Sequence, residues 1–313
     1  MLRPLLNQIF DRYHRPEFLF SDPLEFPHRY TDPWDQEAVA LVSALLAYGN
    51  VKQIRRSVEE VLRRIHAIAA GPADFVRRLE GGSRKTGLEG FIHRFNTGAD
   101  LGLLFLLLQR SWKEQGSLGA HFMVGLEPGA ETITEAVNRL IGDWRAWIRQ
   151  DPGLRALFRL NPSFSYLLTA PEDGSCCKRW CMFLRWMGRK EKDAPLDLGL
   201  WAEGSELALR TFAPGRFLRA SQLVIPLDTH TGRISQYLGL TERKSLNWLA
   251  ALEVTRSLRE ACDAEDPTRY DFALARLGIL DLCQKRYRAE ICERCALLPA
   301  CRFSSVNRQK SVS

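Results

Sequence analysis

Four cysteines near the C-terminus are spaced closely enough to share a metal. Cys283, Cys292, Cys295 and Cys301 follow the pattern C-x8-C-x2-C-x5-C, and the residues between them are mostly polar. Thiolates are soft ligands that select zinc or iron–sulfur clusters. Structural zinc sites usually pair two short C-x2-C hooks, whereas this chain has one such hook flanked by two longer arms. We therefore expect a [4Fe-4S] cluster here, with zinc as the less favoured occupant.

A second stretch with chemical potential is "LVIPLDTHTGRIS", residues 223–235. Asp228 follows an apolar run and precedes His230 and Arg233. A carboxylate in a pocket can stabilise the positive charge that develops at a sugar C1′ when a glycosidic bond breaks. The same acid stands where it could cap a helix, and both roles are compatible. His230 and Arg233 could contact phosphate, although His230 is equally well explained as a partly buried histidine with a structural hydrogen bond.

A lysine that could act with this acid lies in "EDGSCCKRWCMFLRWMGR", residues 172–189. Lys178 stands at the expected start of a helix, after Gly174 and beside Arg179. A cation at a helix start beside a second cation is disfavoured, and an amine must be uncharged to act as a nucleophile. The simpler interpretation is an exposed lysine or one that binds phosphate. The three cysteines of this stretch are expected to be small core thiols.

Composition favours a globular protein with an acidic partner. The chain has 313 residues, is 45% hydrophobic and carries a net charge of +7. Lys and Arg outnumber acids by eight to three from Arg276 to the C-terminus, and such basic stretches favour nucleic acid. No signal peptide is evident, and the longest apolar run, residues 101–109, is too short to cross a bilayer, so we expect a cytoplasmic protein that does not bind membranes. In that compartment the eight cysteines are not expected to form disulfides.

Hydrophobic periodicity predicts helices almost throughout. The clearest are 37–48, 132–148, 243–261 and 266–279. Thr132 with Glu135 predicts a capping box, and Asp266 followed by Pro267 predicts the start of the last helix. Strand signals are almost absent, so the predicted fold class is all-α.

Three of these stretches resemble one known family. "YDFALARLGILDLC" running into the cysteine pattern looks like the C-terminal iron–sulfur module of the endonuclease III and MutY branch of the helix–hairpin–helix DNA glycosylases. "PLDTHTGRISQYLGL" is similar to the stretch that carries the family's essential aspartate, and Gly174 with Lys178 matches its hairpin and lysine. Cys176 replaces the hairpin's second glycine, and an insertion at 190–221 separates Lys178 from Asp228. With "FLRWMGR", that insertion resembles an uncharacterised bacterial branch, domain of unknown function 2400.

The resemblance implies a two-lobed helix–hairpin–helix fold with a cluster loop. One lobe would span 35–192, and the other would join 1–34 to 193–313. It also implies a monomeric glycosylase and abasic-site lyase, acting through Lys178 and Asp228 on duplex DNA with a damaged or mismatched base. DNA contacts are then expected from the following residues: Gly174, Arg179, His230, Arg233, Tyr48 and Asn50. For Tyr48, the polar end of a buried helix is the favoured interpretation.

Two other functions remain open. The chain could be a non-catalytic nucleic-acid-binding protein that keeps the fold and the cluster, for which the altered hairpin is the best support. It could also be a helical binding protein stabilised by zinc.

Overall fold

The fold is all-α, as predicted. The computed structural model describes residues 2–79, 86–191 and 196–303. The helices of this part are α1 (Leu2–Tyr13), α2 (Pro33–Leu45), α3 (Val51–His66), α4 (Pro72–Arg78), α5 (Gly98–Gln115), α6 (Leu118–Val124), α7 (Thr134–Gln150), α8 (Pro152–Leu160), α9 (Lys178–Gly188), α10 (Glu206–Thr211), α11 (Thr229–Tyr237), α12 (Trp248–Ala261), α13 (Asp271–Ile279) and α14 (Ala289–Cys292). Within the described ranges, no helix combines the length and the apolar composition that crossing a bilayer requires.

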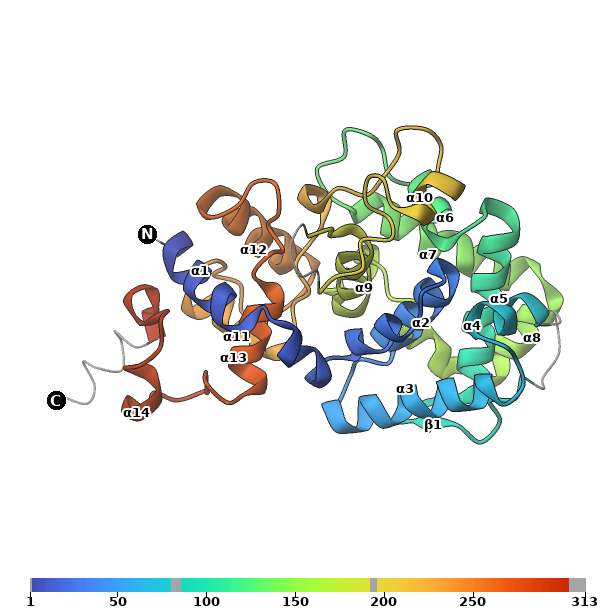
Figure 1. Ribbon diagram of the computed structural model, residues 1–313, viewed down its shortest axis with the longest axis horizontal. Helices are drawn as coiled ribbons and strands as arrows, with labels where there is room; N and C mark the ends of the chain where they lie inside the picture. The colour runs from blue at the N-terminus through green and yellow to red at the C-terminus, as the bar shows by residue number, and fades with distance from the viewer. Residues whose placement is uncertain (1, 80–85, 192–195, 304–313) are drawn as a thin grey trace.

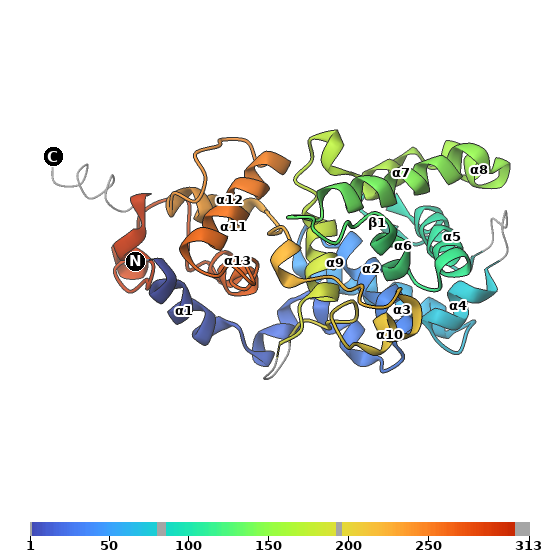
Figure 2. The ribbon, with the colours of Figure 1, turned by 90° about the horizontal axis from the view of Figure 1, so that it is seen from above.

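The helices form two groups that lie at opposite ends of the molecule. Figures 1 and 2 show α1 with α11–α14 at one end and α2–α10 at the other. The predicted second lobe, 1–34 plus 193–313, contains both α1 and α10. α1 packs along α13, whereas α10 packs on α6 and α2 in the other group.

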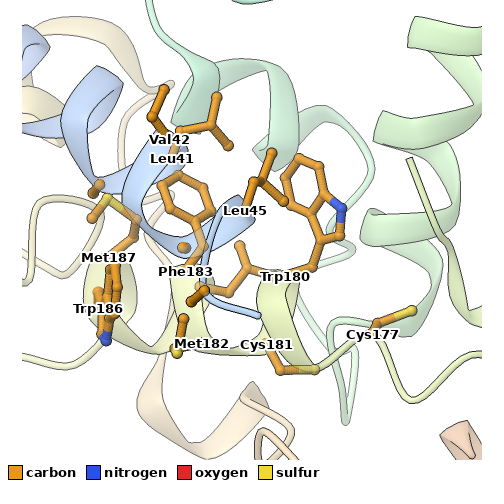
Figure 3. Packing of buried hydrophobic residues seen from close by; sticks show 14 of the residues in the cluster. Leu41, Val42, Leu45, Cys177, Trp180, Cys181, Met182, Phe183, Trp186 and Met187 are labelled. Atoms are coloured by element: carbon orange, nitrogen blue, oxygen red, sulfur yellow. The ribbon is translucent and has the colours of Figure 1, made fainter. Parts of the chain in front are cut away.

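The packing of α2 against α9 forms the centre of the larger group. α2 begins with Pro33 at its first position, and the Asp32 carboxylate accepts from the amides of Trp34 and Asp35. Most of its residues are buried, and Figure 3 shows Leu41 and Leu45 of α2 beside Trp180 and Phe183 of α9. This contact fixes the direction of α9 and so the place of Lys178 at its first residue.

Two of the predicted helix starts were wrong. α7 begins at Thr134 with Ile133 as its N-cap, and no side chain caps it, so the Thr132/Glu135 box does not form. α13 begins at Asp271, because the Asp266 carboxylate accepts from Arg189 Nε at 2.8 Å instead of capping a helix. Arg189 is 3% exposed, and a buried guanidinium without carboxylate partners would be strongly destabilising.

The described part of the insertion, 196–221, is built into the core. Trp201 is fully buried and Asp197 is 2% exposed, so this stretch does not form a surface loop. Trp201 Nε1 donates to the buried Glu37 carboxylate at 2.9 Å, and Asp197 accepts from Arg189 Nη1 at 2.6 Å. The remaining residues of the insertion, 192–195, lie outside the described ranges.

A short hairpin interrupts the helices between α4 and α5. β1 (Ile92–His93) pairs antiparallel with β2 (Asn96–Thr97), with His93 opposite Asn96. Each strand has only two residues, so no alternating pattern existed in the sequence to reveal it.

Candidate active site

A cavity of about 760 Å³ lies where the two groups of helices meet. Its wall is built from the first turn of α9, the first turn of α11, one face of α13 and the segment between α2 and α3. Six of the predicted site residues line it: Lys178, Asp228, Tyr48, Asn50, Arg179 and His230. Residues far apart in sequence therefore share one wall, and the size suits a small-molecule or nucleotide-sized group.

Lys178 is half-buried at the first turn of α9. Its Nζ donates to the carbonyl of Ala47, two residues beyond the end of α2, at 3.1 Å. No carboxylate of the described residues makes a salt bridge with it. The α9 helix starts abruptly because its N-cap, Cys177, has the left-handed φ of 47°. The amine is thus directed towards the cavity wall formed by the α2–α3 segment, with a single neutral partner.

Asp228 caps α11, as its position in the sequence predicted. Its Oδ1 accepts from the amides of His230 and Thr231, both at 2.7 Å. No described residue donates to Oδ2. One oxygen of the carboxylate therefore orients the side chain against the helix, while the other remains available to a group in the cavity.

A thiol joins the segments that carry the lysine and the acid. Cys176 Sγ donates to the carbonyl of Leu227, the residue before Asp228, at 3.4 Å. On the same segment, Ser175 forms an isolated β-bridge with Asn247. The fifty residues between Lys178 and Asp228 therefore do not separate them in space. Gly174 itself does not line the cavity; its φ of 74° lies in the left-handed region that favours glycine, and it ends the short turn before α9.

Asp271, on α13, is a cavity residue that the sequence interpretation missed. It is 6% exposed and accepts from Arg185 Nη1 at 2.8 Å. Burial raises the pKa of Asp271 to about 7; Arg185 opposes the rise and Asp228 adds to it. At neutral pH this carboxyl is therefore partly protonated, whereas an exposed aspartate is not. The available signal was an acid in the otherwise apolar stretch "DFALA".

Tyr48 and Arg179 line the cavity and are held in place by bonds to other parts of the protein. The Tyr48 hydroxyl donates to Asn96 Oδ1 at 2.5 Å, and burial raises its pKa to about 12. Arg179 is 8% exposed; it donates to the carbonyl oxygens of Leu45 and Tyr166, and its guanidinium lies 4.0 Å from the centre of the Tyr166 ring. With its donors occupied in this way, Arg179 supports the cavity and offers little to an external phosphate.

The remaining predicted contacts also have structural partners. Asn50 is exposed and caps α3, accepting from the amide of Lys52 at 2.9 Å. His230 packs against Gly278, where a Cβ would come within 2.3 Å of its ring. Arg233 does not line the cavity; it donates to the carbonyl of Cys283 at 2.7 Å, which ties α11 to the cysteine loop.

The four cysteines of the C-terminal loop are half-buried. Electrostatic interactions connect Cys283 with Cys295 and Cys301, and burial raises the pKa of Cys283 to about 11. Within residues 2–79, 86–191 and 196–303, however, no three histidine, cysteine or acidic side chains converge closely enough to hold a metal ion. The donor set suits a thiolate cluster, but its arrangement here does not assemble one, and the cofactor stays a prediction.

The sequence matches the family model described as "Protein of unknown function (DUF2400)" over residues 22–280. The chain belongs to the DUF2400 family. The matched range contains Lys178, Asp228 and Asp271 and ends before Cys283. No curated protein and no solved structure matches the chain.

This family membership corrects the predicted relationship to the endonuclease III and MutY branch of the helix–hairpin–helix glycosylases. The match is to an uncharacterised family, and nothing in it connects the DUF2400 chain with that superfamily. Short motifs such as D-T-H and a cysteine run recur in unrelated chains, because helix caps and thiol ligands are general solutions.

Proposed function

We propose that this DUF2400 protein cleaves N-glycosidic bonds of damaged or mismatched bases in duplex DNA, using Lys178 as an amine nucleophile. The observation that carries the proposal is that Lys178 and Asp228 line one cavity, although fifty residues separate them. The cavity supports this by itself, without kinship to known glycosylases. A base in a duplex can reach such a cavity only after rotating out of the helix.

The reaction requires groups that the cavity supplies. The ammonium of Lys178 would first lose a proton to solvent. The resulting amine would give its electron pair to C1′ while the base leaves with the pair of the C1′–N bond. Asp228, through Oδ2, would stabilise the positive charge that develops at C1′. Asp271, protonated in part at neutral pH, is placed on the same wall and would give its proton to the departing base.

The covalent adduct would then open a path to strand cleavage. The bond between O4′ and C1′ breaks with its pair going to oxygen, the amine loses a proton, and C1′ becomes an iminium carbon bonded to Lys178 Nζ. Loss of a proton from C2′ expels the 3′-phosphate, and water releases the lysine. The abundance of basic residues, 44 Lys and Arg against 37 acids, supports a polyanionic substrate.

Borohydride trapping tests this reaction directly. Sodium borohydride reduces an iminium to a stable amine, so wild-type protein mixed with a duplex containing an abasic site should form a covalent complex visible on a denaturing gel. Lys178→Ala should abolish that complex. Lys113→Ala, which removes an exposed lysine on α5, is the matched control and should leave trapping unchanged.

Asp228→Asn isolates the charge of the acid. Asparagine caps helices as well as aspartate does, so Oδ1 keeps its two amide donors and α11 keeps its start. We expect normal folding and base release slowed by about 10²- to 10³-fold, the cost of removing one stabilising group. Trapping that survives Lys178→Ala would refute the nucleophile, and unchanged base release in Asp228→Asn would refute the role of the acid.

A non-catalytic nucleic-acid-binding protein is the second candidate. The bond from Lys178 Nζ to the Ala47 carbonyl favours it, because a lysine held by the backbone can serve to shape the wall. Salt-sensitive binding of duplex DNA with no trapping and no base release on a panel of lesions would support this second function over the first.

For the cysteine loop we propose a [4Fe-4S] cluster that orders the loop and takes no part in the reaction. Four thiols on one loop support it, and ordering by a metal would bring the thiols together from their present spacing. Iron and acid-labile sulfide in equal amounts in the purified protein would bear this out. Zinc in their place would favour the zinc-stabilised alternative.

A further inference from the structure

The β1–β2 hairpin is held rigidly beside the cavity. Its inward residues, His93 and Asn96, are both 0% exposed. The His93 ring bonds to the Ser57 hydroxyl of α3 at 2.8 Å, and Asn96 donates to the Ser163 carbonyl at 3.1 Å and accepts from Tyr48. Two buried polar side chains therefore fix a turn of only two residues, Arg94 and Phe95.

The outward residues of the turn are exposed despite this rigid support. Phe95 is 46% exposed, and its ring stacks on Tyr48 with centroids 5.3 Å apart and meets the edge of Tyr166 at 4.6 Å. Tyr48 and Tyr166 both line the cavity. The exposed face of Phe95 is therefore the outer end of an aromatic stack that begins in the cavity wall.

Exposed basic side chains lie on the hairpin and on the adjoining helix α3. Arg94 is exposed, makes no salt bridge with a described residue, and lies with its guanidinium carbon 5.9 Å from the centre of the Tyr48 ring. Gly49 makes room for it, since a Cβ there would come within 2.9 Å of Arg94 Nη1. Lys52 and Arg56, one turn apart on α3, are also exposed, and no described carboxylate pairs with them. The α3 helix packs on β1, so Lys52 and Arg56 belong to the helix that adjoins the hairpin.

We propose that the hairpin is a base-stacking element: Phe95 stacks on the nucleobase next to the nucleotide held in the cavity, and Arg94 contacts the adjoining phosphate. A flat exposed ring flanked by unpaired cations is the combination that binds nucleobases and their backbone. The inference rests on the proposed function for the nature of the substrate. It adds Phe95, which takes no part in the reaction, as a DNA-binding residue, and it names the neighbouring nucleobase as the partner of the exposed ring.

Binding without chemistry tests the stacking. The probe is a fluorescent duplex with a tetrahydrofuran abasic analogue, which cannot form a Schiff base, and fluorescence anisotropy gives the Kd. Phe95→Ala should weaken binding by about 5- to 100-fold, the range expected for one lost base–aromatic contact. Phe95→Trp should retain wild-type affinity, whereas Phe95→Leu, apolar but not aromatic, should not. Leu209→Ala, at a 76% exposed apolar residue on α10, is the matched control and should bind as wild type.

The phosphate contact has a separate readout. Arg94→Ala should lower the slope of log Kd against log salt by about one, the value for one lost phosphate contact. An unchanged affinity in Phe95→Ala, or recovery of affinity in Phe95→Leu, would overturn the stacking, as would wild-type protein that does not bind the duplex.

The two proposals fail in different ways. Trapping at Lys178 together with normal binding by Phe95→Ala would remove the stacking element and leave the proposed reaction. Loss of binding in Phe95→Ala without any trapping by wild type would retain the stacking element in a protein that binds DNA without cleaving it.

Discussion

Asp271→Asn should make the protein progressively more stable relative to wild type as pH rises. Aspartic acid in an unfolded chain titrates near 3.9, whereas burial raises the pKa of Asp271 in the folded protein to about 7. Between these two pH values the unfolded chain has released the proton and the folded protein retains it. Rising pH therefore favours unfolding of the wild type across this window, and stability is fully present only below the lower value. Asparagine does not titrate, so the variant escapes this loss.

The difference in pKa sets the size of the effect. About three pH units at about 1.36 kcal/mol each correspond to a loss of up to about 4 kcal/mol between pH 4 and pH 7. Arg185 keeps a carboxylate partner in the variant, because its Nη2 lies 3.2 Å from Asp197 Oδ1. The variant therefore does not leave a buried arginine without a counter-ion, and the pH-dependent part of the difference reports Asp271 itself.

Urea denaturation at intervals from pH 4.5 to pH 8 measures this difference. The free energy of unfolding of Asp271→Asn minus that of wild type should increase with rising pH, by at most about 4 kcal/mol. Asp11→Asn, at an exposed aspartate on α1, is the control and should run parallel to wild type. If this difference stays constant or decreases as pH rises, the reasoning is refuted. Such a result would show that Arg185 keeps Asp271 ionised throughout.

Two further predictions concern the elements that hold the site. Trp201→Ala should lower the free energy of unfolding by about 3–5 kcal/mol, because a fully buried side chain is removed and Glu37 loses a donor. Urea denaturation measures this loss. A loss no larger than that of the exposed Leu209→Ala would contradict the core position of the insertion. Arg233→Ala should speed amide hydrogen exchange in the cysteine loop without altering exchange in α9, because the bond to the Cys283 carbonyl is lost. Equal exchange in the two proteins would show that the loop is held by other contacts.

The apolar periodicity of the sequence determined the all-α class. Runs such as 37–48 bury most faces of a helix wherever they pack, so their conformation needs no knowledge of their partners. The helix cap at Asp228 was predictable for the same reason, since a carboxylate before a helical stretch bonds the nearest free amides. Asp266 shows the limit of such local rules, because its carboxylate accepts from the buried Arg189, the residue after α9, and caps no helix.

The cavity depended on contacts that no local pattern encodes. Lys178 and Asp228 could be chosen from the sequence as reactive types, but the bond between Cys176 and the Leu227 carbonyl, across fifty residues, decided that they share a wall. Asp271 became a site residue only because α13 packs against α11, and its raised pKa follows from burial there. The sequence alone determined which segments are helical and which side chains could react, because these depend on neighbours along the chain. The tertiary structure decided which of those side chains meet and how their charges are shifted, because burial and distance are set by segments far apart in sequence.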